Sequence, residues 1–111
     1  MDELTELTDD TFYNIDKPNK YIIYFTAEWC GPCKSIYPFL CKLNEKSSDF
    51  KIYKIDVDSN ESLVKKYNIK SMPTFIFMID DKNICETCGA DKNKLSENII
   101  KYFKISNNIK K

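Results

Sequence analysis

Two cysteines lie three positions apart in the segment Trp29–Lys34, which reads Trp-Cys-Gly-Pro-Cys-Lys. The apolar run Tyr21–Phe25 precedes this segment, and apolar residues with helical spacing follow it. Residues i and i+3 on a helix lie roughly 5–6 Å apart, a separation that a disulfide can bridge. Cys30 and Cys33 can therefore form and break a disulfide locally, and this context makes them a dithiol reaction centre.

A helix that begins at this motif would favour the first cysteine as the nucleophile. Apolar residues at 36, 39, 40 and 43 follow the i, i+3, i+4, i+7 pattern, which places both cysteines at the start of that helix. A helix N-terminus lowers the pKa of a thiol below its usual value of about 8.5 and so increases the fraction of thiolate. We expect Cys30 to be the exposed nucleophile and Cys33, inside the first turn, to resolve the mixed disulfide. Pro32 suits an early helical position because it has no amide hydrogen to leave unpaired.

Short apolar strands that alternate with amphipathic helices must position this centre, and they predict an α/β domain with a mostly parallel sheet. Strands are expected at three apolar runs, 21–25, 50–57 and 75–79. Besides the helix after the cysteines, helices are expected after Thr8 with its acidic neighbours Asp9 and Asp10, near Leu63 and after Asp91. The 111 residues suffice for one domain, 1–111, and its last residues, Lys110 and Lys111, are expected to fray.

Charge and composition exclude several classes of protein. Lysine and arginine together number 17, as do aspartate and glutamate, so no net field favours nucleic acid or an anionic membrane. Every one of these cations is lysine, so the arginine fork that reads phosphate and guanine is missing. No apolar stretch approaches the roughly 20 residues of a membrane span, and the acidic start Met1–Leu4 does not resemble a signal peptide. We expect a cytoplasmic protein without nucleic-acid or membrane partners.

Several segments, in a fixed order, resemble the thioredoxin family. They cover nearly the whole chain and are Leu7–Phe12, Ala27–Lys34, Asp56–Asp58, Met72–Phe75 and Gly89–Lys92. The resemblance implies the thioredoxin fold, with a central mixed sheet of about five strands flanked by about four helices. It also implies a protein-disulfide reductase in which Cys30 attacks a substrate disulfide and Cys33 displaces the reduced product. The reducing direction rests on the Gly31-Pro32 pair, which is typical of reducing members of the family.

The resemblance further implies that the redox-active Cys30–Cys33 disulfide takes the place of a bound cofactor. Electrons would come from NADPH through a thioredoxin reductase, or from another dithiol donor, and would pass to disulfide-containing protein substrates. This is a role in electron transport and cell redox homeostasis, carried out by a monomer. The alternative is a thioredoxin-fold binding module or scaffold in which redox turnover is incidental.

A substrate groove beside the dithiol is also implied by the resemblance. In the family the proline that matches Pro73 is cis, and the residue before it, here Met72, pairs with substrate backbone. The groove residues are Trp29, Gly31, Pro32, Met72, Pro73 and Gly89. From the sequence alone Pro73 could instead be a strand starter, and Gly89 a turn glycine before Asp91.

Tyr24 departs from the family pattern. Thioredoxins usually bury an aspartate six residues before the nucleophile, where it moves the proton of the resolving cysteine. Lys54 matches the lysine that accompanies this aspartate, and without a carboxylate its amine must face solvent or incur a desolvation cost. Glu28 is close in sequence and could relay the proton through water. Glu28, Lys54 and Tyr24 are therefore the candidates for a proton relay, and we expect resolution to be slowed rather than abolished.

A second pair with the same spacing, Cys85 and Cys88, precedes Gly89. A four-cysteine zinc site is disfavoured because the two pairs are too far apart in sequence for a zinc ribbon, so no metal is expected. A disulfide between Cys85 and Cys88 is also disfavoured, because three residues of strand span about 10 Å. The resemblance places Cys88 near the groove, where it is a regulatory thiol, an intermolecular disulfide site or, as the favoured interpretation, a small buried apolar residue. Cys41 is most simply a spare thiol.

Overall fold

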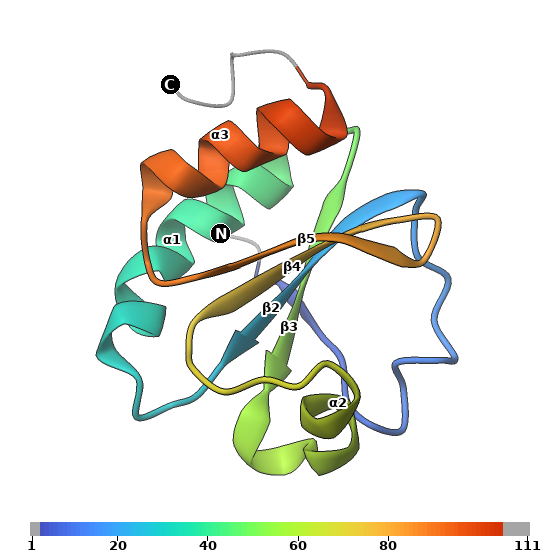
Figure 1. Cartoon of the computed structure of the whole chain (residues 1–111), viewed down its shortest axis with the longest axis vertical. Coiled ribbons are helices and arrows are strands. Elements are labelled where there is room, and N and C mark those ends of the chain that lie inside the picture. Colours follow the sequence, from blue (N-terminus) through green and yellow to red (C-terminus); the bar gives the residue numbers. More distant parts are fainter. Residues whose placement is uncertain (1–2, 106–111) are drawn as a thin grey trace.

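A mixed sheet of five strands forms the centre of the computed structural model, which describes residues 3–105 (Figure 1). The strands are β1 (Thr5–Glu6), β2 (Lys20–Thr26), β3 (Lys51–Asp56), β4 (Thr74–Ile79) and β5 (Lys82–Cys88), in the spatial order β1-β3-β2-β4-β5. The first three are parallel to one another, whereas β4 and β5 are antiparallel to their neighbours. The predicted strands are confirmed, and the expected fraying at Lys110 and Lys111 lies outside the described residues.

Helices cover both faces of this sheet. Within the described residues they are α1 (Gly31–Lys46), α2 (Glu61–Lys66), α3 (Lys92–Phe103) and a short 3-10 helix at Val57–Ser59. Apolar residues of α1 and α3 share one core with the sheet, and Leu63 of α2 belongs to a second core on the opposite face. Figure 1 shows α1 and α3 together, away from α2. Strands β2 and β4 are buried on both sides, as their continuous apolar sequences require.

The helix expected after Thr8 does not form, so the prediction of four α-helices is wrong: residues 3–105 contain three. The amides of Thr11 and Phe12 bond the Thr8 carbonyl, but the chain makes only a turn there. The Asp9 carboxylate, expected to lie in the first turn of its own helix, instead accepts the amide of Leu63 in α2. Phe12 is buried, but Ile15, three positions later, is exposed, so this segment lacks the apolar stripe that would hold a helix on the sheet.

Candidate active site

Cys30 and Cys33 form a disulfide at the N-terminus of α1, with their Cα atoms 5.3 Å apart. Cys30 is the N-cap residue, with extended backbone angles, and its sulfur accepts the amide of Cys33 at 3.2 Å. Gly31 and Pro32 form the first helical positions, where the missing amide hydrogen of proline leaves no bond unmade. The local sequence thus places the Cys30 sulfur where helix amides stabilise a thiolate once the disulfide is reduced.

The exposed side chain at this site is Trp29 rather than Cys30. In the disulfide form Cys30 is only 5% exposed and Cys33 is fully buried, whereas Trp29 is 67% exposed. The expectation of an exposed nucleophile is therefore wrong for the oxidised chain. Bonded to Cys33, Cys30 belongs to the core cluster that also contains Ala27 and Ile36. Cys33 is nevertheless the more deeply buried of the two, as its place inside the helical turn predicts.

The Met72-Pro73 peptide bond is cis, which confirms the conformation that the resemblance implied. Phe25 of β2 pairs with Thr74 of β4, so the cis bond lies at the end of the sheet where β2 runs into the cysteines. Met72 packs against the core cluster that contains both cysteines. These contacts place the cis-proline segment beside the disulfide.

Gly89 completes this edge of the site. Its amide donates to the Pro73 carbonyl at 2.9 Å, which ties the end of β5 to the cis bond. Its φ of +96° is a backbone conformation that side-chain-bearing residues rarely adopt. Asp91 caps α3 two residues later by accepting the amide of Lys94. Gly89 therefore serves both as the turn before α3 and as a partner of Pro73.

Trp29 is held by a residue to which the sequence assigned no role. Its indole Nε1 donates to Asp58 Oδ2 at 2.9 Å. Asp58 lies in the 3-10 helix, where its amide donates to Asp56 Oδ1 at 2.9 Å. The segment Asp56–Asp58 was part of the resemblance, but nothing in its sequence identified Trp29 as its partner.

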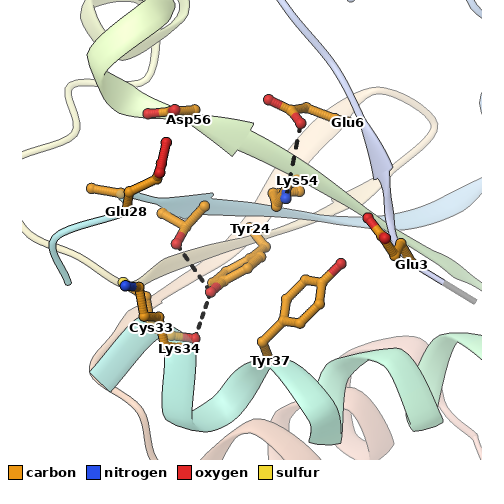
Figure 2. Close-up of a pocket in the computed structure, with 11 residues that line it drawn as sticks. Glu3, Glu6, Tyr24, Glu28, Cys33, Lys34, Tyr37, Lys54 and Asp56 are labelled. Atoms are coloured by element: carbon orange, nitrogen blue, oxygen red, sulfur yellow. Dashed lines mark hydrogen bonds and ion pairs between the residues drawn. The ribbon is translucent and has the colours of Figure 1, made fainter. Parts of the chain in front are cut away.

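Tyr24 lies directly behind the disulfide, with its side chain almost fully buried. Its hydroxyl donates to the backbone carbonyl of Cys33 at 2.8 Å and lies 3.1 Å from the Thr26 hydroxyl (Figure 2). Its ring stacks on Phe75, with centroids 5.3 Å apart and planes 12° apart. Burial raises the pKa of the Tyr24 phenol, which therefore stays protonated at neutral pH.

Lys54 is the register partner of Tyr24, and it pairs with a carboxylate other than the aspartate that Tyr24 replaces. Its Nζ is 3.9 Å from Glu6 Oε1 and 5.3 Å from the centroid of the Tyr37 ring. The lysine therefore neither stands free in solvent nor lies unpaired in the core, which were the two expected alternatives. Glu6 could not be identified from the sequence, because the pairing of β1 with β3 is what brings it to Lys54.

A pocket of about 490 Å³ is lined by Tyr24, Lys54 and residues around them (Figure 2). Tyr24 and Cys33 contribute to its lining. Its charged residues are Glu3, Glu6, Glu28, Asp56, Lys34 and Lys54. The pocket thus brings all three relay candidates, Glu28, Lys54 and Tyr24, to one cavity with the resolving cysteine.

The three remaining cysteines are free thiols in different surroundings. Cys41 is buried in the core, and Cys85 is half-buried. Cys88 is exposed, so the favoured interpretation of it as a buried apolar residue is wrong. It is the last residue of an edge strand and pairs with Thr74, with its Sγ 3.5 Å from Thr74 Oγ1. Cys88 is therefore adjacent to Pro73.

Two general features of residues 3–105 complete the description. No three metal-binding side chains gather at one place. None of the helices has both the length and the apolar character needed to cross a membrane.

Comparison with known proteins places the chain in a family. Residues 3–101 match the family model for thioredoxin. The chain belongs to the thioredoxin family. A thioredoxin from Ophiophagus hannah is 42% identical over 82 residues, which are 74% of this chain and 78% of the relative. A thioredoxin H-type from Ricinus communis is 37% identical over 88 residues, 79% of this chain and 75% of the relative.

Solved thioredoxin structures share the fold. Thioredoxin f2 of Chlamydomonas reinhardtii superposes with a TM-score of 0.85 at 31% identity, covering 93% of this chain and 99% of that one. Plasmodium falciparum thioredoxin gives a TM-score of 0.81 at 33% identity, covering 89% and 99%. The chain therefore has the thioredoxin fold and is a thiol-disulfide oxidoreductase of the protein-disulfide reductase type, with Cys30–Cys33 as its redox pair. Its substrates contain disulfides, and a reductase-type donor returns it to the dithiol form.

Proposed function

We propose that the chain reduces protein disulfides in two exchange steps. The Cys30 thiolate attacks one substrate sulfur, forming a mixed disulfide and releasing the other substrate sulfur as a thiolate, which takes up a proton. Cys33 then loses its proton and attacks Cys30 Sγ, which releases the second substrate thiol and forms the Cys30–Cys33 disulfide. Two electrons and two protons pass to the substrate. The observation that carries this proposal is the Cys30–Cys33 pair at a helix N-terminus beside a cis proline.

The groove around the pair would bind the substrate as an extended segment. Met72 offers backbone hydrogen-bonding groups next to the cis bond, and Pro73 shapes the groove. Trp29 forms its exposed rim, held by Asp58. Gly31 and Gly89 have no side chain and open space where one would lie, and Pro32 has a compact ring, so the three would leave room for the backbone of the substrate.

Of the three relay candidates, Glu28 is the best proton acceptor for Cys33. Lys54 is already engaged in an ion pair with Glu6. Tyr24 donates its own proton to a carbonyl. Glu28 shares the pocket with Cys33 and can take the proton through water. Because this route is longer than a direct contact, we expect resolution to be slowed rather than abolished.

We propose the following setting for the reaction. The whole chain, 1–111, acts as one domain and as a monomer in the cytoplasm, without a bound cofactor. Electrons come from NADPH through a thioredoxin reductase, or from another dithiol donor, which makes the chain part of electron transport and cell redox homeostasis. Support for this setting comes from the free thiols Cys41, Cys85 and Cys88, which are typical of proteins in a reducing compartment.

We also propose that Cys88 is a regulatory thiol. It is exposed on the strand that pairs with β4 at Thr74, directly after Pro73. A mixed disulfide between Cys88 and a small thiol would place bulk beside the cis bond and obstruct the substrate groove. Such an adduct forms when the Cys88 thiolate attacks a low-molecular-weight disulfide and releases one of its thiols.

Reduction of insulin by dithiothreitol tests the proposed function. The chain is compared with Cys30→Ser at pH 7, and precipitation of the released insulin B chain is followed by turbidity. We expect the chain to shorten the lag before precipitation and the variant to behave like the buffer control. Equal lags for both proteins would overturn the reductase and favour the binding module, in which the groove holds a partner without redox turnover.

A further inference from the structure

We propose that Tyr24 is a positioning residue for the second exchange step, a role that rests on the proposed reductase function. Its hydroxyl donates a hydrogen bond of 2.8 Å to the carbonyl of Cys33, so the backbone of the resolving cysteine is tied to β2 in the centre of the sheet. Tyr24 therefore does more than fill the place of a missing carboxylate. It holds Cys33 in the position from which Cys33 attacks Cys30.

The hydrogen-bonding pattern fixes the direction of this contact. A phenol has one proton, and a backbone carbonyl can only accept, so that proton is committed to Cys33. The Thr26 hydroxyl, 3.1 Å away, can then donate to the phenol oxygen. Tyr24 is thus a fixed donor with both of its hydrogen-bonding roles filled, and it is not free to accept the proton that Cys33 releases.

The sheet sets the position of this donor. Tyr24 pairs with Phe75 across β2 and β4, and the two rings stack with their planes 12° apart. Phe75 follows the cis Pro73 by two residues. Since neither ring can turn without disturbing a fully packed core, the hydroxyl is held at a defined place between the resolving cysteine and the strand that carries the substrate groove.

The hydrogen bond from Tyr24 supports α1 near a break in the helix's own hydrogen bonds. Pro38 lies inside α1 and has no amide hydrogen, so the carbonyl of Lys34 lacks its usual partner four residues later. The helical ladder is therefore interrupted one residue after Cys33. The bond from Tyr24 anchors the turn that carries Cys33 from outside the helix, next to the interruption.

The expected effect on rate is moderate and confined to one step. A single neutral hydrogen bond contributes about 1 kcal/mol, which corresponds to roughly fivefold in rate when it is lost in the transition state. Loss of the Tyr24 bond frees the turn around Cys33, so resolution slows. Tyr24 makes no hydrogen bond to Cys30, so the first attack on a substrate disulfide proceeds at its normal rate.

Single-turnover kinetics of Tyr24→Phe test this role. This change removes only the hydroxyl and keeps the ring stacked on Phe75. The first step is measured in a Cys33→Ser background, where the mixed disulfide with insulin accumulates. Resolution is measured in the dithiol protein by acid quenching and mass determination of the mixed disulfide. We expect Tyr24→Phe to slow resolution about fivefold and to leave the first step within twofold.

Tyr21→Phe is the matched control, because Tyr21 is also buried on β2 and its hydroxyl donates to Asp81 at 2.6 Å on the other face of the sheet. It should change neither step. Unchanged resolution in Tyr24→Phe, or equal slowing of both steps, overturns the positioning role. Failure of the proposed function would look different, since the unmodified chain would then form no mixed disulfide with insulin.

Discussion

Tyr24 and Lys54 show how one uncommon residue redistributes the contacts around it. With a phenol in place of the family's carboxylate, Lys54 pairs with Glu6 on the neighbouring strand. The phenol turns its proton toward the backbone of Cys33. The negative charges of the pocket are thus carried by residues at its margin, Glu28 among them, rather than by a side chain beneath the sulfurs.

The free cysteines of the oxidised chain should differ in reactivity. Cys88 is exposed, Cys85 is half-buried with its pKa raised by burial, and Cys41 is enclosed. Because the thiolate is the reactive form, a maleimide at pH 7 should label Cys88 first, Cys85 several-fold more slowly and Cys41 only on unfolding. Peptide mapping of the labelled chain gives the order, and Cys88→Ser should lose the fast phase. Labelling of Cys41 at the rate of Cys88 would contradict this arrangement.

At the scale of elements, the turn that replaces the expected first helix is bonded to α2. Asp9 Oδ1 and Oδ2 accept the amides of Leu63 and Ser62 at 3.0 and 3.2 Å, and its own amide donates to Asn60 Oδ1 at 2.7 Å. The α2 N-cap, Asn60, makes no capping bond with its own side chain. A residue more than fifty positions away therefore caps this short helix, which could not stand alone in water.

Removing this long-range cap should reduce stability without affecting the redox site. We expect Asp9→Ala to lower the free energy of unfolding by about 1–2 kcal/mol, the usual contribution of a capping side chain. For a domain of this size the melting temperature should fall by roughly 4–8 °C per kcal/mol. Calorimetry of the oxidised chain measures the change, and Asp10→Ala, at the exposed neighbouring position, serves as the control. Equal melting temperatures for the two variants would argue against the cap.

The same segment shows where sequence reasoning succeeds and fails. The strands at 21–25 and 75–79 could be predicted because burial on both faces requires an apolar side chain at nearly every position. Thr8 and Asp9 were expected to begin a helix of their own, which was wrong, because the helix that Asp9 caps is distant in sequence. The local sequence indicates which hydrogen bonds a side chain is able to make, whereas the fold determines which partner it meets.

The candidate site divides in the same way. The dithiol, its place at the start of a helix and the cis proline follow from short motifs with strong geometric requirements. The bonds from Tyr24 to Cys33 and from Trp29 to Asp58, and the pairing of Lys54 with Glu6, depend on strand register and on packing between elements. The exposure of Cys88 depends on β5 being an edge strand, which the alternation of residues alone did not reveal.

For the whole molecule, buried and half-buried tyrosines determine how stability changes at alkaline pH. Burial is the main cause of a raised pKa at five of them, Tyr21, Tyr24, Tyr37, Tyr53 and Tyr67. For Tyr67 the value rises to about 12. The unfolded chain loses these protons near pH 10, earlier than the folded chain. The stabilisation is therefore complete below about pH 10 and is lost progressively as the pH rises through the folded-state pKa values.

Urea unfolding at several pH values should show this dependence. The chain has no histidine, so we expect an almost constant urea midpoint between about pH 6 and 8 and a steep fall above about pH 10. Tyr67→Phe removes one of the contributing groups and should make the alkaline fall shallower. A midpoint that stayed level to pH 12 would show that the phenols ionise equally in both states.

The Cys30 sulfur is covered while the Trp29 ring projects from the surface, and we expect this contrast to decide which electron donors react fastest with the oxidised chain. A small thiol should reduce the disulfide slowly even when its redox potential is favourable. It has no surface that fits the Trp29 ring and the cis-proline edge. A protein whose extended segment binds along this edge positions its thiolate next to the Cys30 sulfur. We therefore expect selectivity among donors to be kinetic and determined by shape, so that the chain equilibrates more slowly with small thiols than with a protein donor.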